Sequence, residues 1–183
     1  MNINYPHSIQ NCLGEKLTFL SVEKDAQGDK VIVENRVTPH HGPPMHTHYL
    51  QDECLTVTSG KMGYQVLGQD VQYAYPGESV LFKRGTPHKF WNAGEDELSC
   101  TGWIQPANTI VFFLSSIFEA QNKSGKGQPE LFDGAYLLTR YAREYDMAEI
   151  PAFVKKTVMP FTYFLGRLLG KYKHFSDAPE PLK

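Results

Sequence analysis

The sequence predicts a mainly β protein, an antiparallel sandwich or barrel that is followed by α-helices. Between residues 16 and 104, short runs of β-branched and aromatic residues alternate with turns that contain Gly and Pro. Short, evenly spaced strands of this kind are typical of sandwiches and barrels. From Gln105 onward the apolar residues recur at helical spacing instead. The change of period divides the chain into a β part and a helical part.

The β part is expected to cover residues 16–105, after an N-terminal arm at 1–15. The expected strands lie at 16–23, 30–37, 53–59, 61–67, 71–75, 78–82, 88–92 and 97–104. The turns between them contain sequences such as PGE, RGTP and NAGED, which favour tight changes of direction.

The helical part is expected over residues 106–175, with a flexible polar tail at 176–183. Its first helix begins near Asn108, which is placed to cap it, and the last helical pattern is interrupted by Pro160. Two interpretations of these helices stay open. They cover the barrel or join two subunits, or the basic and apolar stretch at 155–173 lies on a membrane surface.

Composition excludes several classes of protein. The formal charge is −2, with 18 Lys and Arg against 20 Asp and Glu, so we expect no nucleic-acid partner. The sequence has neither a secretory signal pattern nor an uncharged apolar run of about 18 residues, which a membrane span needs. Cys12, Cys54 and Cys100 are widely spaced and form no CxxC pair, so neither disulfides nor a thiolate zinc site is indicated. We therefore expect a cytoplasmic protein.

Residues 42–60, GPPMHTHYLQDECLTVTSG, carry the candidate chemistry. In a half-buried strand, Glu53 shares the inward face with Leu55. His46 and His48 are two residues apart, so both imidazoles leave the same face of an extended segment. Buried polar groups are costly unless a partner satisfies them, and a divalent cation does so by coordination.

A second segment, GESVLFKRGTPHKFWN at 77–92, supplies a third histidine. His88 follows the RGTP turn and alternates in phase with Phe90 and Asn92. The predicted metal ligands are therefore His46, His48, Glu53 and His88. The alternative interpretation is a set of surface histidines with an acid in a salt bridge.

The two segments resemble the two motifs of the cupin superfamily. The matching residues are His46, His48, Glu53 and Gly60 in the first segment, and Gly77, Gly85, His88 and Asn92 in the second. Two departures are Lys83, where the motif has Pro, and the short spacing from Gly42 to the first histidine. The resemblance implies a double-stranded β-helix, or jelly-roll, barrel. It extends to single-domain bacterial cupins with a helical extension, and it implies a homodimer.

The resemblance also implies metal-dependent enzymes such as dioxygenases and isomerases. Three imidazoles and one carboxylate suit Fe, Mn, Ni, Co, Cu or Zn, and affinity alone does not choose among these metals. We predict one divalent transition metal and an oxygenase or isomerase that acts on a small molecule. Two alternatives stay open: a non-catalytic metal or ligand-binding module, and a membrane-surface or partner-docking protein that acts through its helices.

A pocket is expected beside the metal. The residues predicted to line it are Gln51, Met62, Tyr64, Phe82, Phe90 and Asn92. His40 and His41 lie in the preceding loop, where they face solvent or fold over the mouth and act as a general base. An aromatic lining favours an apolar or aromatic small molecule.

Overall fold

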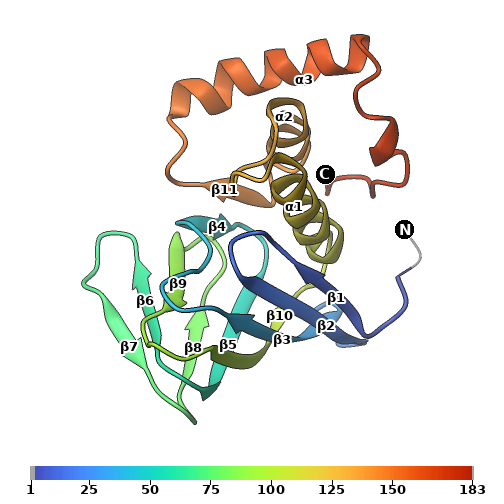
Figure 1. The fold of residues 1–183 in the computed structure, drawn as a ribbon. Coiled ribbons are helices and arrows are strands. Elements are labelled where there is room, and N and C mark those ends of the chain that lie inside the picture. The colour runs from blue at the N-terminus through green and yellow to red at the C-terminus, as the bar shows by residue number, and fades with distance from the viewer. Residues whose placement is uncertain (1–2, 183) are drawn as a thin grey trace.

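The predicted mainly β fold with helices after it is confirmed. The computed structural model describes residues 3–182, which form two antiparallel sheets and, toward the C-terminal end of the chain, three α-helices (Figure 1). The six-stranded sheet consists, in spatial order, of β1 (His7–Gln10), β2 (Glu15–Glu23), β3 (Lys30–Val37), β10 (Leu98–Gln105), β5 (Asp52–Ser59) and β8 (Ser79–Phe82). The five-stranded sheet consists of β11 (Tyr145–Met147), β4 (His46–His48), β9 (His88–Asn92), β6 (Met62–Val66) and β7 (Gln72–Ala74).

One apolar core joins the two sheets. Leu17, Val33 and Leu55 from the six-stranded sheet lie in the same buried cluster as Met62 and Phe90 from the five-stranded sheet. Inner faces that share a core in this way form a sandwich, and removing their apolar area from water is the main stabilising contribution. The candidate ligands lie on these two sheets.

Strand β5 has the alternation that the sequence predicts. Glu53, Leu55 and Val57 are buried, whereas Asp52 and Cys54 are half-buried. Because successive side chains of a strand point to opposite faces, the carboxylate of Glu53 enters the sandwich together with the two apolar residues. The sequence therefore specifies the direction of this acid correctly.

Three short strands were not predicted, namely β1, β4 and β11. Strand β1 lies in the segment expected to be an N-terminal arm, and it pairs with β2 in antiparallel register. Strand β11 lies where a helical pattern was expected, and it pairs with β4, so that Tyr145 is opposite His48. Three or four residues are too few to show an alternation, and pairing with a neighbouring strand decides their structure.

The cap of helix α1 (Ile110–Ser124) lies one residue later than predicted. The cap position is held by Thr109, and the prediction that Asn108 caps the helix is wrong. Asn108 has a left-handed backbone with φ of 43°, and the Thr109 hydroxyl donates to Glu144 Oε1 at 2.9 Å instead of capping the helix. Phe112, Phe113 and Phe118 of α1 are buried, as their helical spacing predicts.

The other helices differ from the predicted boundaries. Helix α2 (Leu131–Arg140) ends before residue 145, where β11 begins. A π-helical segment, η1 (Val154–Val158), leads into α3 (Met159–Leu168), and a short 3₁₀ turn, η2 (Lys173–Phe175), follows. Pro160 lies in the first turn of α3, where its missing N–H is tolerated, so the chain changes helix type there and continues.

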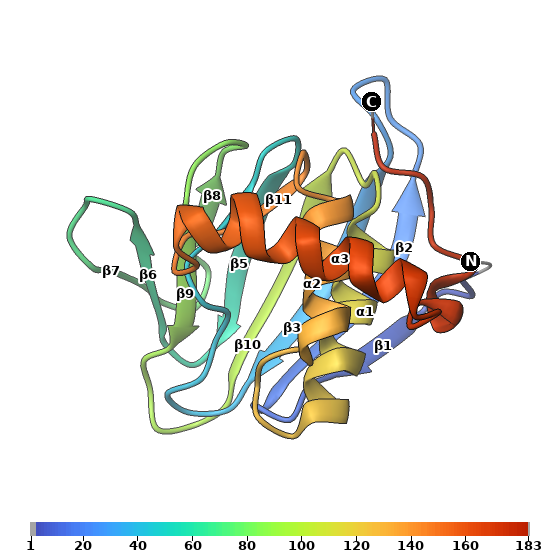
Figure 2. The same ribbon diagram turned by 90° about the horizontal axis from the view of Figure 1, so that it is seen from above.

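The helices are stacked in layers at one end of the sandwich (Figures 1 and 2). Helix α1 contacts β1, α2 packs on α1, and α3 packs on α2. Helix α3 therefore lies on the side of α2 that is farthest from the sheets, as both views show.

The segment near the C-terminus contacts the folded part. Residues 1, 2 and 183, which belong to the expected arm and tail, lie outside the described residues. Within the expected tail, the carbonyl of Pro179 accepts a hydrogen bond of 2.7 Å from the hydroxyl of Tyr141. This bond ties the segment after η2 to the end of α2.

Candidate metal centre

His46 and His48 lie on β4, a three-residue strand that is paired on both sides. On one side β4 pairs with β9, where His46 is directly opposite His88. On the other side it pairs with β11, where His48 is opposite Tyr145. The backbone N–H of Gly85 also donates to the carbonyl of His48 at 2.7 Å, and Gly85 has φ of 77°, which favours glycine. The turn before His88 is thereby fixed against the strand that carries the other two histidines.

The fourth group comes from the opposite sheet. Glu53 lies on β5, and one ligand atom from each of His46, His48 and Glu53 lies within 4.8 Å of the others. Nε2 of His88 is 3.3 Å from Oε2 of Glu53. The ring centroid of His46 lies 4.9 Å from that of His48 and 4.5 Å from that of His88. The structure therefore brings all four predicted residues together between the two sheets.

Backbone carbonyls orient two of the imidazoles in the same way. Nδ1 of His46 is 2.8 Å from the carbonyl oxygen of Pro44, and Nδ1 of His88 is 2.8 Å from that of Thr86. A carbonyl only accepts, so Nδ1 carries the proton in each pair and Nε2 keeps its lone pair. Metal-binding histidines commonly have this arrangement, because the hydrogen bond fixes both the tautomer and the ring orientation.

Two contacts test whether a cation fits. Nδ1 of His48 is buried without a hydrogen-bond partner among residues 3–182, and it lies 3.9 Å from Oε2 of Glu53. His88 lies between two acceptors, the carbonyl of Thr86 and the carboxylate of Glu53, and a neutral imidazole has a single N–H to donate. Ligand atoms about 2.1 Å from one cation lie about 3 Å apart, which is close to the His88–Glu53 separation. A cation here satisfies both histidines, so the donor set fits a metal.

Burial sets the protonation states of the site. Burial and the neighbouring imidazoles lower the pKa of His46 to about 3, and burial lowers the pKa of His48 to about 4. Burial acts to raise the pKa of Glu53, but the neighbouring imidazoles of His88, His48 and His46 outweigh it and lower the pKa to about 2. At neutral pH the site offers two neutral imidazoles with free lone pairs and one carboxylate anion. Divalent transition metals bind ligands in these states.

The aromatic residues predicted to line a pocket divide into two groups. The ring of Phe82 is stacked on His88, with centroids 4.1 Å apart and planes at 8°, and the half-buried Tyr64 lies edge-on to Phe82. Met62 and Phe90 are fully buried members of the core. Phe82 and Tyr64 thus form an apolar wall on the His88 side of the site.

The two amides predicted for the pocket have other contacts. Asn92 donates to the carbonyl oxygens of Val37 and Asp96 and accepts from the N–H of Gly94, so it holds the ends of three segments together. Gln51 is buried and donates to Oε2 of Glu144 at 2.9 Å.

Glu144 belongs to a buried polar cluster that sequence analysis missed. Its carboxylate accepts from Gln51, from the hydroxyl of Thr109 and from the hydroxyl of Tyr145. The ring of Tyr145 lies edge-on to His48, with centroids 5.7 Å apart. The cluster therefore supports one wall of the metal centre from the start of α1 and from β11.

His40 and His41 contact the loop rather than the four predicted ligands. The side chain of His40 is 67% exposed, and its Nε2 lies 3.7 Å from a carboxylate oxygen of Glu95. Nδ1 of His41 is 2.8 Å from the carbonyl oxygen of Pro39. These contacts correspond to the solvent-facing interpretation of the two residues.

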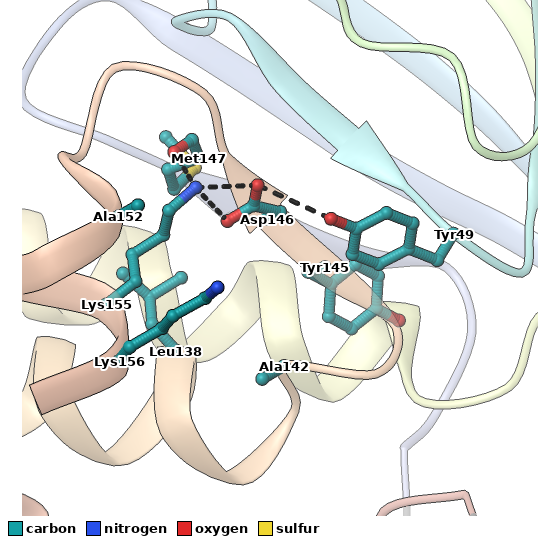
Figure 3. Close-up of a pocket in the computed structure, with 9 residues that line it drawn as sticks. All are labelled: Tyr49, Leu138, Ala142, Tyr145, Asp146, Met147, Ala152, Lys155 and Lys156. Carbon is teal, nitrogen blue, oxygen red and sulfur yellow. Dashed lines mark hydrogen bonds and ion pairs between the residues drawn. The ribbon is translucent and has the colours of Figure 1, made fainter. Parts of the chain in front are cut away.

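A cavity of about 300 Å³ is lined by residues of α2, β11 and η1 (Figure 3). Tyr49, Tyr145, Asp146 and Lys155 are among the residues that line it. The carboxylate of Asp146 holds Nζ of Lys155 at 2.8 Å and accepts from the hydroxyl of Tyr49 at 3.4 Å. These bonds tie η1 to β11 and to the loop after β4.

The comparison with protein families found a match within the β-sandwich. Residues 33–104 match the family model described as Cupin domain. The match supports a cupin barrel, and its range contains all four predicted ligands. Glu144 and the helices lie beyond it.

Two further comparisons concern individual proteins. The chain is similar to the oxidoreductase iacF of Pestalotiopsis fici, with 34% identity over 67 residues, which are 36% of this chain and 33% of that protein. The chain spans about a third of the length of the curated relatives that it matches. Among solved structures, KdgF from a Halomonas species has 18% identity and a TM-score of 0.45, and the match covers 56% of this chain and 91% of that one. A sugar phosphate isomerase from Silicibacter pomeroyi has 20% identity and a TM-score of 0.43, and the match covers 51% of this chain and 60% of that one.

Proposed function

We propose that the protein is a mononuclear metal-dependent enzyme that acts on a small molecule. The proposed ligands are His46, His48, Glu53 and His88. One observation carries the proposal: oriented neutral imidazoles and an ionised carboxylate lie together inside the sandwich, where such groups are costly to bury without a cation.

The metal is one of Fe, Mn, Ni, Co, Cu or Zn. Bound to this donor set, it supplies Lewis-acid activation of a substrate oxygen and, if it is redox-active, dioxygen chemistry. The protein's own groups do the rest. Pro44 and Thr86 hold two imidazoles in the ligating tautomer, Glu53 offsets part of the cationic charge, and Phe82 excludes water from the His88 side.

The reaction class is an oxygenase or an isomerase. The name of the fungal relative, an oxidoreductase, favours the first class. Four protein ligands on a six-coordinate ion leave two positions for a chelating substrate, or for one substrate oxygen and dioxygen. The half-buried Tyr64 beside Phe82 favours a substrate with an apolar or aromatic part. The homodimer and the cytoplasmic location stay predictions.

A second candidate is a metal that stabilises the barrel without turnover. The burial of the ligands favours it, because His48, Glu53 and His88 are 5%, 7% and 1% exposed, and His46 is half-buried. A closed shell of ligands is typical of structural sites, whereas catalytic sites keep a position open.

Two measurements test the proposal. Metal analysis of the purified protein is expected to find about one transition metal per chain, as the one cluster of such donors within residues 3–182 requires. Dioxygen uptake is then measured with thiols, catechols and diketones, for the wild type and for Glu53→Ala. Uptake that is lost in the variant supports an oxygenase, whereas stoichiometric metal with no turnover of any of these compounds or of sugar-phosphate isomers supports the structural role. Absence of metal from the purified protein, together with no uptake of added metal, would overturn both candidates.

A further inference from the structure

The outer face of α3 is apolar and uncovered. Four residues at the spacing of an amphipathic stripe, Phe161, Phe164, Leu165 and Leu168, are 66%, 58%, 38% and 69% exposed. Such a stripe usually faces the core. In α3, however, the opposite side of the helix faces the core and the stripe faces outward. Crossing a bilayer needs a longer and more apolar helix than any within residues 3–182.

Specific contacts hold the helix in this orientation. On the inner side of α3, Gly166 lies against the ring of Tyr172, at a position where a Cβ atom would collide with its hydroxyl. Tyr163 is stacked with Tyr172, and both lie against Tyr136 of α2. At the start of the helical segment, Lys155 is fixed by Asp146 (Figure 3). The outward direction of the stripe is therefore built into the packing.

Charge is distributed unevenly around the stripe. Residues 151–175 contain five Lys and Arg and no Asp or Glu, whereas the chain as a whole has 18 basic and 20 acidic residues. The remainder of the chain therefore carries a formal −7, from thirteen basic and 20 acidic residues. Lys155 is paired with Asp146, but Lys156, Arg167 and Lys173 have no carboxylate partner within residues 3–182. Cations without partners therefore flank the exposed apolar face.

The combination of charge and exposure selects one partner. Two copies of this face in a symmetric dimer would bring two uncompensated basic segments together, which is unfavourable. A bilayer surface with anionic lipid offers an apolar phase for the stripe and negative charge for the flanking cations. The geometry points to α3 as an interfacial helix that docks the protein on an anionic phospholipid surface, with Phe161, Phe164 and Leu168 inserted among the lipids. This function is independent of the metal centre.

Vesicle flotation tests the inference with the full chain. Wild-type protein is expected to float with vesicles of phosphatidylcholine and phosphatidylglycerol, to float less with phosphatidylcholine alone, and to detach as salt is added. The triple variant Phe161→Ser, Phe164→Ser, Leu168→Ser removes the three most exposed residues of the stripe without changing charge or a buried residue. Its flotation is expected to be lost. Lys156→Glu with Arg167→Glu keeps the stripe and is expected to reduce partitioning to anionic vesicles by about fivefold or more for each charge removed.

A matched control replaces exposed apolar residues of the barrel. Leu67→Ser with Leu81→Ser, at 59% and 50% exposure, is expected to float like the wild type. Circular dichroism and melting confirm that each variant is folded, so that lost flotation reports the surface. Three results would overturn the inference: no flotation of the wild type, flotation that the triple variant keeps, or a wild-type dimer that the triple variant breaks while neither protein binds anionic vesicles.

Discussion

The interior of the sandwich and the outer face of α3 depart from the usual burial pattern in opposite directions. Between the sheets, His48, Glu53 and His88 are polar and almost fully buried. On α3, Phe161 and Leu168 are apolar and mostly exposed. Buried ionisable groups and exposed apolar stripes both cost free energy unless a partner covers them. The two proposals therefore assign partners of opposite chemistry to the two regions, a cation inside and an apolar, anionic surface outside.

The two regions also differ in how strongly their geometry specifies the partner. In the candidate metal centre, hydrogen bonds from Nδ1 of His46 and of His88 to the carbonyl oxygens of Pro44 and Thr86 fix individual ligand atoms. On α3 the packing of Gly166 and Tyr163 fixes only which face is presented. A metal site therefore predicts sharp effects of single substitutions, whereas a lipid-facing surface predicts graded effects that add over several residues.

The largest expected effect is the loss of metal from His88→Ala. Removing an outer partner of a ligand costs about 10–100-fold in metal affinity, so removing the ligand itself is expected to cost more than about 100-fold. Titration with Co²⁺ followed by absorbance measures the affinity. The exposed His40→Ala is the matched control and is expected to bind as the wild type does. Equal affinity of His88→Ala and the wild type would remove His88 from the ligand set.

A phenylalanine is expected to contribute very differently to the free energy of unfolding in the two regions. Phe19, on β2, is completely buried, and Phe19→Ala is expected to lower the free energy of unfolding by about 3–5 kcal/mol. Phe164 is 58% exposed, and Phe164→Ala is expected to change the free energy of unfolding by no more than about 0.5 kcal/mol. Urea denaturation measures both. A large destabilisation by Phe164→Ala would show that the outer face packs within the fold.

Glu144 is expected to matter for the fold as a buried acceptor. Glu144→Ala leaves the donors of Gln51, Thr109 and Tyr145 without their acceptor and is expected to lower the free energy of unfolding by about 2 kcal/mol. Glu144→Gln, which keeps one acceptor oxygen, is expected to cost less. The exposed Glu149→Ala serves as the control and is expected to be nearly neutral. A stability of Glu144→Ala equal to that of the control would contradict the role of the cluster.

The smallest expected effect is a pH dependence of the metal-free protein. The pKa values of His46 and His48 are lowered to about 3 and about 4, below the value of about 6.5 in the unfolded chain. Below pH 6.5 the unfolded chain therefore binds protons that the folded protein does not bind, so stability is lost as pH falls. Between pH 7 and pH 6 these two histidines are expected to contribute a loss of about 1 kcal/mol, whereas Glu15, whose pKa burial raises to about 7, contributes in the opposite direction; denaturation of the wild type and of histidine variants at each pH measures the histidine contribution. His48→Gln is expected to make the dependence shallower, and an unchanged slope would contradict the lowered pKa.

Much of the barrel and its candidate site could be predicted because the relevant residues are close in the sequence. The alternation around Glu53 sets its direction, and the two-residue spacing of His46 and His48 places their imidazoles on one side. His88 required a second segment, but its turn and the alternation after it are also local. The local sequence pattern is enough to predict the direction of a side chain where a single strand determines that direction.

Contacts between distant segments could not be predicted in this way. Gln51 was placed in the pocket by its parity, but its partner Glu144 lies 93 positions away, in a turn that no periodicity marks. Strand β11 has three residues, too few for an alternation, and it forms because β4 offers an edge. The stripe of α3 is visible in the sequence, but which layer lies beneath the helix depends on the packing of α1 and α2.

The most direct test of the metal centre is X-ray absorption spectroscopy of the protein loaded with one metal ion per chain. We predict a first shell with three imidazoles and one carboxylate oxygen from the protein, and with one imidazole fewer in His46→Ala. A spectrum without imidazole scattering, or one that His46→Ala and His88→Ala both leave unchanged, would contradict the proposal that these residues bind the metal.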